Sequence, residues 1–161
     1  MRLSGNGNTV GAVLVELYDA TPPSALTPAT PRLTNVSVLK NVGSGLTAGF
    51  VIDGQGNKTV LIRAVGSSLA PFGVGGLLGD PKLELFDGQS RSIMANDNWG
   101  DTGAFTTATS AFAQVGAFAL AHSASKDAAL LVTLAPGNYT VQVRSADITT
   151  GLALVEGYEV P

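Results

Sequence analysis

Short apolar runs alternate with polar residues along most of the chain, and glycine-rich or proline-rich turns separate the runs. Alternation with a period of two residues is typical of β-strands that bury one face. After residue 32 this pattern predicts strands over 33–39, 48–52, 59–65, 82–86, 92–95, 128–134, 139–144 and 152–159. These strands are enough for an all-β domain, and we expect a two-sheet antiparallel β-sandwich of jelly-roll type.

The segments between the strands predict how the chain is connected. Residues 53–57 read Asp-Gly-Gln-Gly-Asn, a strong turn signal, and predict that strands 48–52 and 59–65 form a hairpin. The glycine-rich segment 66–80 carries scattered apolar residues and predicts a packed loop that crosses one end of the core. Residues 104–120 lack clean alternation, so a short helix that covers an end of the sandwich is expected there.

The pattern near the N-terminus duplicates the pattern at the C-terminus. Residues 11–19 (Gly-Ala-Val-Leu-Val-Glu-Leu-Tyr-Asp) match residues 151–159 (Gly-Leu-Ala-Leu-Val-Glu-Gly-Tyr-Glu), each residue aligning with the one 140 positions later. The match extends backwards, so that Met1 aligns with the interior strand position Val141. A repeat at this spacing is typical of like domains in a row. We therefore predict that residues 1–19 form a second copy of the C-terminal hairpin.

A proline-rich segment separates this copy from the rest of the chain. Residues 20–32 contain four prolines, which deny backbone donors to a sheet and favour an extended, semi-rigid conformation. The predicted organisation is an N-terminal hairpin over 1–19, a linker over 20–32 and a β-sandwich repeat domain over 33–161. The hairpin is interpreted either as an assembly strand or as the end of a preceding repeat.

Composition excludes several classes of protein. With 45% hydrophobic and 13% charged residues, the chain can bury a core and is not disordered. A net charge of −3 without a cluster of Lys and Arg excludes nucleic acid as a partner. No apolar run approaches the roughly 20 residues that a membrane span needs. The absence of cysteine excludes disulfides, thiolate metal sites and cysteine nucleophiles.

Three segments together resemble a repeat domain of bacterial secreted and cell-surface proteins: 58–66 (Lys-Thr-Val-Leu-Ile-Arg-Ala-Val-Gly), 80–87 (Asp-Pro-Lys-Leu-Glu-Leu-Phe-Asp) with 96–99 (Asn-Asp-Asn-Trp), and 134–143 (Leu-Ala-Pro-Gly-Asn-Tyr-Thr-Val-Gln-Val). The second and third segments are also similar to pre-peptidase C-terminal domains, which are β-sandwich modules appended to secreted enzymes. The resemblance implies a jelly-roll-like sandwich, an extracellular or cell-surface location, and an accessory, adhesive or structural role. It carries no catalytic residues. The proline-rich spacer and the duplicated hairpin depart from a lone appended module.

Acidic and amide side chains cluster at the ends of neighbouring predicted strands. Such oxygens are the ligands that Ca²⁺ prefers, and the ion takes about six to eight of them. Their spacing matches no EF-hand loop, and Asp and Asn are also ordinary turn residues. Calcium is therefore one interpretation and turn chemistry the other. The candidate calcium ligands are Asp80, Asp87, Asn96, Asp97, Asn98 and Asp101.

The single tryptophan and the single histidine are each candidates for a functional role. Trp99 follows three polar residues and is a candidate platform for stacking on a surface glycan, although a lone Trp in a sandwich is usually a core anchor. His122 leaves Ser68, His122 and Asp127 as the one conceivable catalytic triad. The sequence around Ser68 lacks the second glycine of a nucleophile elbow. We therefore expect a protein that is not an enzyme, with His122 solvated at a strand edge.

The duplicated strand predicts the function. If residues 151–159 fill their groove in the sandwich, the apolar face of residues 11–19 needs another partner, supplied by strand addition to a second copy or a neighbouring repeat. The candidate assembly residues are Val13, Leu14, Val15, Glu16, Leu17 and Tyr18. The prediction is a structural subunit of an extracellular fibre or tandem-repeat surface protein that needs no cofactor. The alternative is an appended adhesive or carbohydrate-binding module with calcium as its cofactor. Whether residues 1–19 dock on their own chain or on a neighbour stays open.

Overall fold

The computed structural model describes residues 3–7, 9, 11–25, 27, 29–30, 33–102 and 105–161. The chain divides into two compact units, Met1–Leu33 and Thr34–Pro161. Every β-strand of the described residues belongs to the second unit. In the first unit the described residues include one short 3-10 helix, η1 (Pro23–Ala25).

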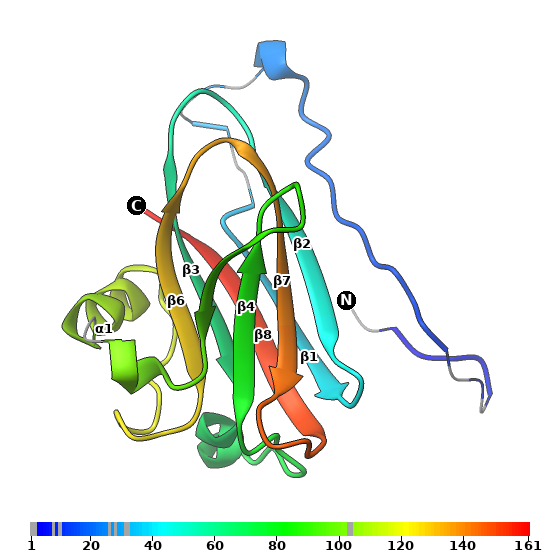
Figure 1. The fold of residues 1–161 in the computed structure, drawn as a ribbon. Helices are drawn as coiled ribbons and strands as arrows, with labels where there is room; N and C mark the ends of the chain where they lie inside the picture. The colour runs from blue at the N-terminus through cyan, green and yellow to red at the C-terminus, as the bar shows by residue number, and fades with distance from the viewer. Residues whose placement is uncertain are drawn as a thin grey trace. The chain divides into compact units, whose positions relative to one another are not determined.

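The second unit is a sandwich of two antiparallel four-stranded sheets (Figure 1), which confirms the predicted fold class. One sheet has the strand order β1-β8-β3-β6 and the other has the order β2-β7-β4-β5. The strands are β1 (Asn35–Val42), β2 (Leu46–Ile52), β3 (Lys58–Val65), β4 (Pro81–Phe86), β5 (Ser92–Asn96), β6 (Ala128–Leu134), β7 (Gly137–Ser145) and β8 (Gly151–Val160). Each lies over one of the strands expected from the alternation of apolar residues.

The strand pairing is nested, as in a jelly roll. Strand β1 pairs with β8, β2 with β7, β3 with β6 and β4 with β5, so the chain resembles one long hairpin folded across two sheets. The additional pairings β3–β8 and β4–β7 complete the sheets. As a result β8, the last strand in the sequence, lies in the interior of its sheet between β1 and β3.

One predicted connection is wrong. Residues 53–57 do not join a hairpin, because β2 and β3 lie in different sheets. The turn instead carries the chain from one sheet to the other, with Gly54 in the left-handed region at φ 92°. A Gly- and Asn-rich turn permits either path, and local sequence does not decide whether the two flanking strands form hydrogen bonds with each other.

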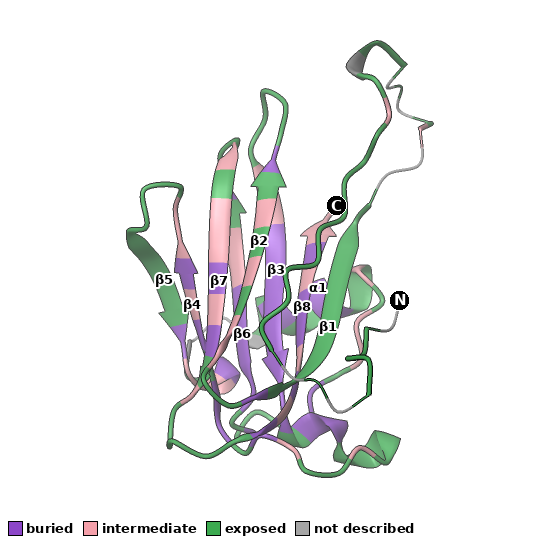
Figure 2. Cartoon of the chain, turned by 90° about the vertical axis from the view of Figure 1, so that its right-hand side faces the viewer, coloured by how far each residue is buried: buried purple, intermediate pink, exposed green. Residues whose placement is uncertain are grey.

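The sandwich has two apolar layers, and β3 and β8 contribute to both. Between the sheets, alternate residues of β3, β4, β7 and β8 form the first core. On the outer face of the β1-β8-β3-β6 sheet lies the second, covered by η2 (Ser67–Phe72), η3 (Trp99–Thr102) and α1 (Phe105–Gln114). Figure 2 shows the buried stretches of β3 and β8 beside the exposed edge strand β1. Burial on both faces explains why residues 60–65 read as an almost continuous apolar run.

The described residues among 3–19 contain no strand, so the structure does not show the hairpin predicted over 1–19. Met1, Arg2, Asn8 and Val10 lie outside the described residues. A two-stranded hairpin is marginal by itself, because no sheet covers its apolar face. Val13, Leu14 and Leu17 are accordingly 73%, 80% and 65% exposed.

The core assignment predicts the effect of truncating a strand residue. Leu83 on β4 is fully buried between the sheets, whereas Leu39 on β1 is 51% exposed. Leu83→Ala should lower the free energy of unfolding by about 2–5 kcal/mol, because the lost contacts leave a cavity. Leu39→Ala should cost less than about 1 kcal/mol. Urea denaturation of both variants checks this, and equal losses would contradict the assigned core.

Candidate functional site

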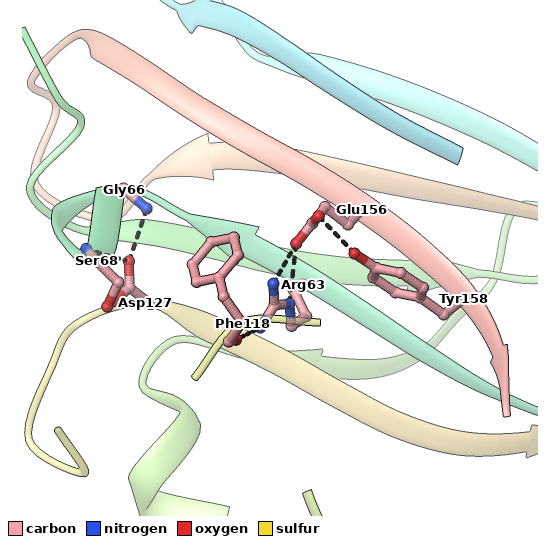
Figure 3. Close-up of polar contacts among 7 residues, drawn as sticks. All are labelled: Arg63, Gly66, Ser68, Phe118, Asp127, Glu156 and Tyr158. Carbon is pink, nitrogen blue, oxygen red and sulfur yellow. Dashed lines mark hydrogen bonds and ion pairs between the residues drawn. The ribbon is translucent and has the colours of Figure 1, made fainter. Parts of the chain in front are cut away.

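A buried ion pair joins β3 and β8, the two central strands of the β1-β8-β3-β6 sheet. Arg63 on β3 lies directly opposite Glu156 on β8, and both side chains are buried. The Nε and Nη2 atoms of Arg63 donate to Oε2 of Glu156 at 3.0 and 2.5 Å (Figure 3). The third nitrogen, Nη1, donates to the backbone carbonyl of Phe118 at 2.6 Å. The charge of Arg63 is thus paired with a carboxylate, and each of its three nitrogens donates a hydrogen bond inside the protein.

Aromatic side chains enclose this ion pair. The guanidinium of Arg63 lies 4.9 Å from the ring centre of Phe112 and 4.5 Å from that of Phe118, within the range of cation–π attraction. The hydroxyl of Tyr158 donates to Oε1 of Glu156 at 2.6 Å. Burial, followed by this hydrogen bond, raises the pKa of Tyr158 to about 12. This buried charge pair, with its hydrogen bonds to Tyr158 and to the backbone of Phe118, holds β3 and β8 together.

A second polar cluster forms around Asp127, which is fully buried just before β6. Its carboxylate accepts hydrogen bonds from the backbone N–H of Gly66 at 2.7 Å and from the hydroxyls of Ser68 and Ser125 at 2.5 and 2.8 Å. Figure 3 shows its contacts with Gly66 and Ser68. The cluster therefore fastens the start of η2 to the start of β6.

The conceivable triad of Ser68, His122 and Asp127 is not assembled. Ser68 donates directly to Asp127, so no imidazole lies between the two side chains. His122 is exposed in a loop, and its backbone carbonyl accepts a hydrogen bond from Nε1 of Trp99 at 3.2 Å. The hydroxyl of Ser68 also accepts the backbone N–H of Ala121 at 2.8 Å. These contacts give Ser68 and Asp127 a structural role in shaping the loops.

Trp99 is a core anchor, and its interpretation as a glycan platform is wrong. The residue is only 3% exposed and packs against Phe112, with ring centres 5.6 Å apart. Its indole N–H donates to the hydroxyl of Ser125 at 3.0 Å. A buried ring whose polar atom is already bonded has no free face for a sugar.

The predicted calcium ligands do not converge. Asp80 precedes the six-residue strand β4 and Asp87 follows it, so the two carboxylates lie at opposite ends of that strand. Asp87 closes the turn to β5 by accepting from the backbone N–H of Gln89 and Arg91 at 2.9 and 3.0 Å. Within the described part of the chain, no group of three or more His, Asp or Glu residues could hold a metal ion. Turn chemistry accounts for Asp87.

Among the remaining candidates, Asn96 forms hydrogen bonds with the backbone, and Asp80 and Asp97 interact with the positive charge of Lys126. The side chain of Asn96 accepts the backbone N–H of Ala129 at 2.9 Å and donates to the carbonyl of Asn98. Lys126 forms an ion pair with Asp80, and this hydrogen bond raises the pKa of Lys126. One carboxylate oxygen of Asp80 and one of Asp97 are buried without a hydrogen bond. The positive charge of Lys126 acts on both carboxylates. Asp101 lies in η3.

The predicted assembly residues lie together on one stretch of the first unit. Residues 11–19 are exposed and form no strand, in contrast to their counterparts in β8. The hydroxyl of Tyr18 donates to Oε1 of Glu16 at 2.8 Å, the same contact that Tyr158 makes with Glu156. This hydrogen bond raises the pKa of Tyr18. The duplication therefore includes a side-chain contact as well as a sequence pattern.

Sequence reasoning missed Arg63 as the partner of Glu156. The available signal was a single arginine inside the apolar run 60–65, together with a single glutamate after the apolar run 152–155. A lone charge on a strand buried on both faces requires an opposite charge nearby. Choosing which charge requires the β3–β8 register, which is a long-range property of the fold.

The chain matches no protein-family model and no curated protein. It is similar in structure to the pre-peptidase C-terminal domain of a collagenase from Bacillus anthracis, solved as a crystal structure. The two chains are 12% identical with a TM-score of 0.43, over 77% of this chain and 89% of that one. This low score gives the likeness no weight for function. Among the described residues, no helix has the length and apolar character needed to cross a membrane.

The ion pair predicts a strong asymmetry between single and double substitutions. Glu156→Ala should lower the free energy of unfolding by about 3–5 kcal/mol, because it leaves the Arg63 charge buried and unpaired. The double variant R63M/E156L should lose much less, since no charge remains inside. Lys58 pairs with Glu159 near the surface, so Lys58→Ala should cost at most about 1 kcal/mol. Denaturant titration measures all three, and equal losses in E156A and K58A would contradict the assigned role.

The pKa of Tyr158 predicts a loss of stability at high pH. The unfolded chain loses the phenolic proton near its ordinary pKa of 10.0, whereas the folded protein keeps it until about pH 12. The unfolded state therefore binds fewer protons in this window, and stability falls as pH rises through it. Tyr158→Phe should remove this component of the pH dependence. Urea denaturation of both proteins between pH 9 and 12 checks the difference, and parallel curves would refute it.

Proposed function

We propose that the protein is a structural subunit of an extracellular fibre or tandem-repeat surface protein, joined to its neighbour through strand addition by residues 11–19. One observation carries this proposal: an exposed segment resembles in sequence the strand that completes the sandwich. The counterparts of Val13 and Val15 in β8, Ala153 and Val155, are buried between the sheets. The same pattern outside a sheet leaves an apolar face without cover.

The energetics of docking favour this role. Full burial of an aliphatic side chain contributes roughly 1.5–3 kcal/mol, and residues 13–17 offer four of them. Ordering an extended segment offsets part of this gain. Backbone hydrogen bonds to the receiving sheet then set the register, as in other complexes formed by strand addition. The partner under this proposal is another copy of the sandwich or a neighbouring repeat.

The second unit has the character of a scaffold. Its buried polar residues Arg63, Asp127 and Glu156 are bonded to one another, to backbone or to serine hydroxyls. The proline-rich segment 20–32 would hold successive sandwiches apart at a set distance. The alternative of an adhesive, calcium-dependent module stands second, because Trp99 is buried and the described residues contain no group of three or more acidic or histidine side chains that could hold a metal ion.

Charged substitutions in the segment should abolish association without unfolding the sandwich. V13E/V15E places two carboxylates on the face that would be buried, so the variant should stay monomeric. Ile148→Glu is the matched control, because Ile148 is an aliphatic residue 98% exposed elsewhere on the molecule. Electron microscopy and light scattering should show assemblies of the wild type and of I148E, with equal melting temperatures for all three proteins. Assembly by V13E/V15E would contradict the proposal, whereas a monomeric wild type would rule out another copy as the partner and leave a neighbouring repeat.

A further inference from the structure

Gly11 aligns with Gly151, the position at the start of β8 where a larger residue would collide with backbone. In the sandwich the backbone of residues 76–78 runs against Gly151: Leu152 donates to the carbonyl of Gly76 at 2.7 Å and accepts from the N–H of Leu78 at 2.9 Å. A Cβ on Gly151 would lie 2.5 Å from the backbone nitrogen of Leu78. A Cβ on Gly11 would meet nothing within 4 Å. A larger residue would fit at position 11 in its present surroundings, whereas the matching position of β8 requires glycine.

The segment also keeps the two side chains that serve the buried ion pair. Glu156 holds the charge of Arg63, and Tyr158 bonds the other oxygen of that carboxylate. Glu16 and Tyr18 occupy the matching positions among apolar residues. A carboxylate on an otherwise apolar strand is tolerated on docking only if the receiving site supplies an opposite charge. The segment is therefore matched to a site that contains a buried arginine.

The positions that differ are compatible with such a site. Leu17 stands where β8 has Gly157, and a Cβ on Gly157 would meet nothing within 4 Å. Asp19 retains the carboxylate of Glu159, which pairs with Lys58. Val13 replaces the fully buried Ala153 and adds two carbons to the core between the sheets. This last change is the tightest fit of the set.

We propose that residues 11–19 bind in the β8 position of a second sandwich of this kind, between its counterparts of β1 and β3, with Glu16 paired to the counterpart of Arg63. This inference rests on the proposed function. The β8 position of residues 34–161 is already filled, so the acceptor is a sandwich that lacks a last strand of its own. A strand added at the free edge of β1 or β6 would reach neither Arg63 nor the backbone of residues 76–78, because β3 and β8 are interior strands.

A fusion protein supplies this acceptor. Residues 34–147 are placed directly before residue 8 of the full chain, so that residue 8 takes the place of residue 148. The first sandwich then has every strand except β8. Hydrogen exchange of residues 11–19 should slow by about 100-fold or more relative to the original chain, as expected for a strand inside a sheet. Unchanged exchange of residues 11–19 would overturn the proposal.

Two substitutions at matched positions sharpen the test. Gly11→Val should abolish the protection in the fusion, because its Cβ would collide with backbone, yet leave the melting temperature of the original chain unchanged. Leu17→Gly restores the β8 residue and should keep the protection. Equal effects of the two substitutions in the fusion would count against the β8 position.

A four-residue graft tests the fit within the original chain. The variant L152A/A153V/G157L/E159D gives β8 the sequence of residues 11–19, and it should unfold cooperatively from a native-like structure. Failure of the graft to fold would overturn the proposal. If the fusion shows no protection while the wild type still assembles, strand addition occurs at another edge and the proposed function survives. If the fusion is protected while the wild type stays monomeric, the acceptor is correct and assembly between separate chains is wrong.

Discussion

The buried ion pair between Arg63 and Glu156 is the contact on which the two layers of the sandwich depend. It spans β3 and β8, the two interior strands of their sheet, in a place where neither charge reaches water. The same guanidinium stacks on Phe112 of α1 and bonds the carbonyl of Phe118, so it also positions the helical cover. Loss of one partner would expose the other to a low-dielectric interior, which makes the seating of β8 conditional on both charges.

The nested pairing gives the last strand an unusual importance. Strand β8 pairs with β1 on one side and β3 on the other, so the first sheet is continuous only when the end of the chain has been added. Such a sheet leaves an open groove, bordered by backbone groups and apolar side chains, until its last strand arrives. A fold completed in this way can take the strand from any segment with the right sequence, which is the physical basis for relating residues 11–19 to β8.

Strand positions were most predictable where a strand records its burial in local alternation, as in residues 82–86 and 139–144. Long-range relations were not. The turn at 53–57 looks the same whether β2 and β3 share a sheet or lie in two sheets. Asp80 and Asp87 are close in sequence but are separated by a whole strand, and Trp99 is buried by a helix that local patterns only loosely indicate. The pairing of Arg63 with Glu156 depends on a register between segments about 90 residues apart, which no local signal encodes.

The two copies of the Glu-Tyr contact show what a sheet adds to a sequence. Tyr158 and Tyr18 bond their glutamates at similar distances, 2.6 and 2.8 Å, so the local geometry needs no partner. The main cause of the raised pKa differs: burial comes first for Tyr158, and the hydrogen bond to Glu16 comes first for Tyr18. The sheet removes the Glu-Tyr pair from water. The positive charge of Arg63 offsets the free-energy cost of burying the carboxylate of Glu156. Residues 11–19 carry the glutamate and the tyrosine without such cover, and for this reason we propose a binding site for them in another sandwich.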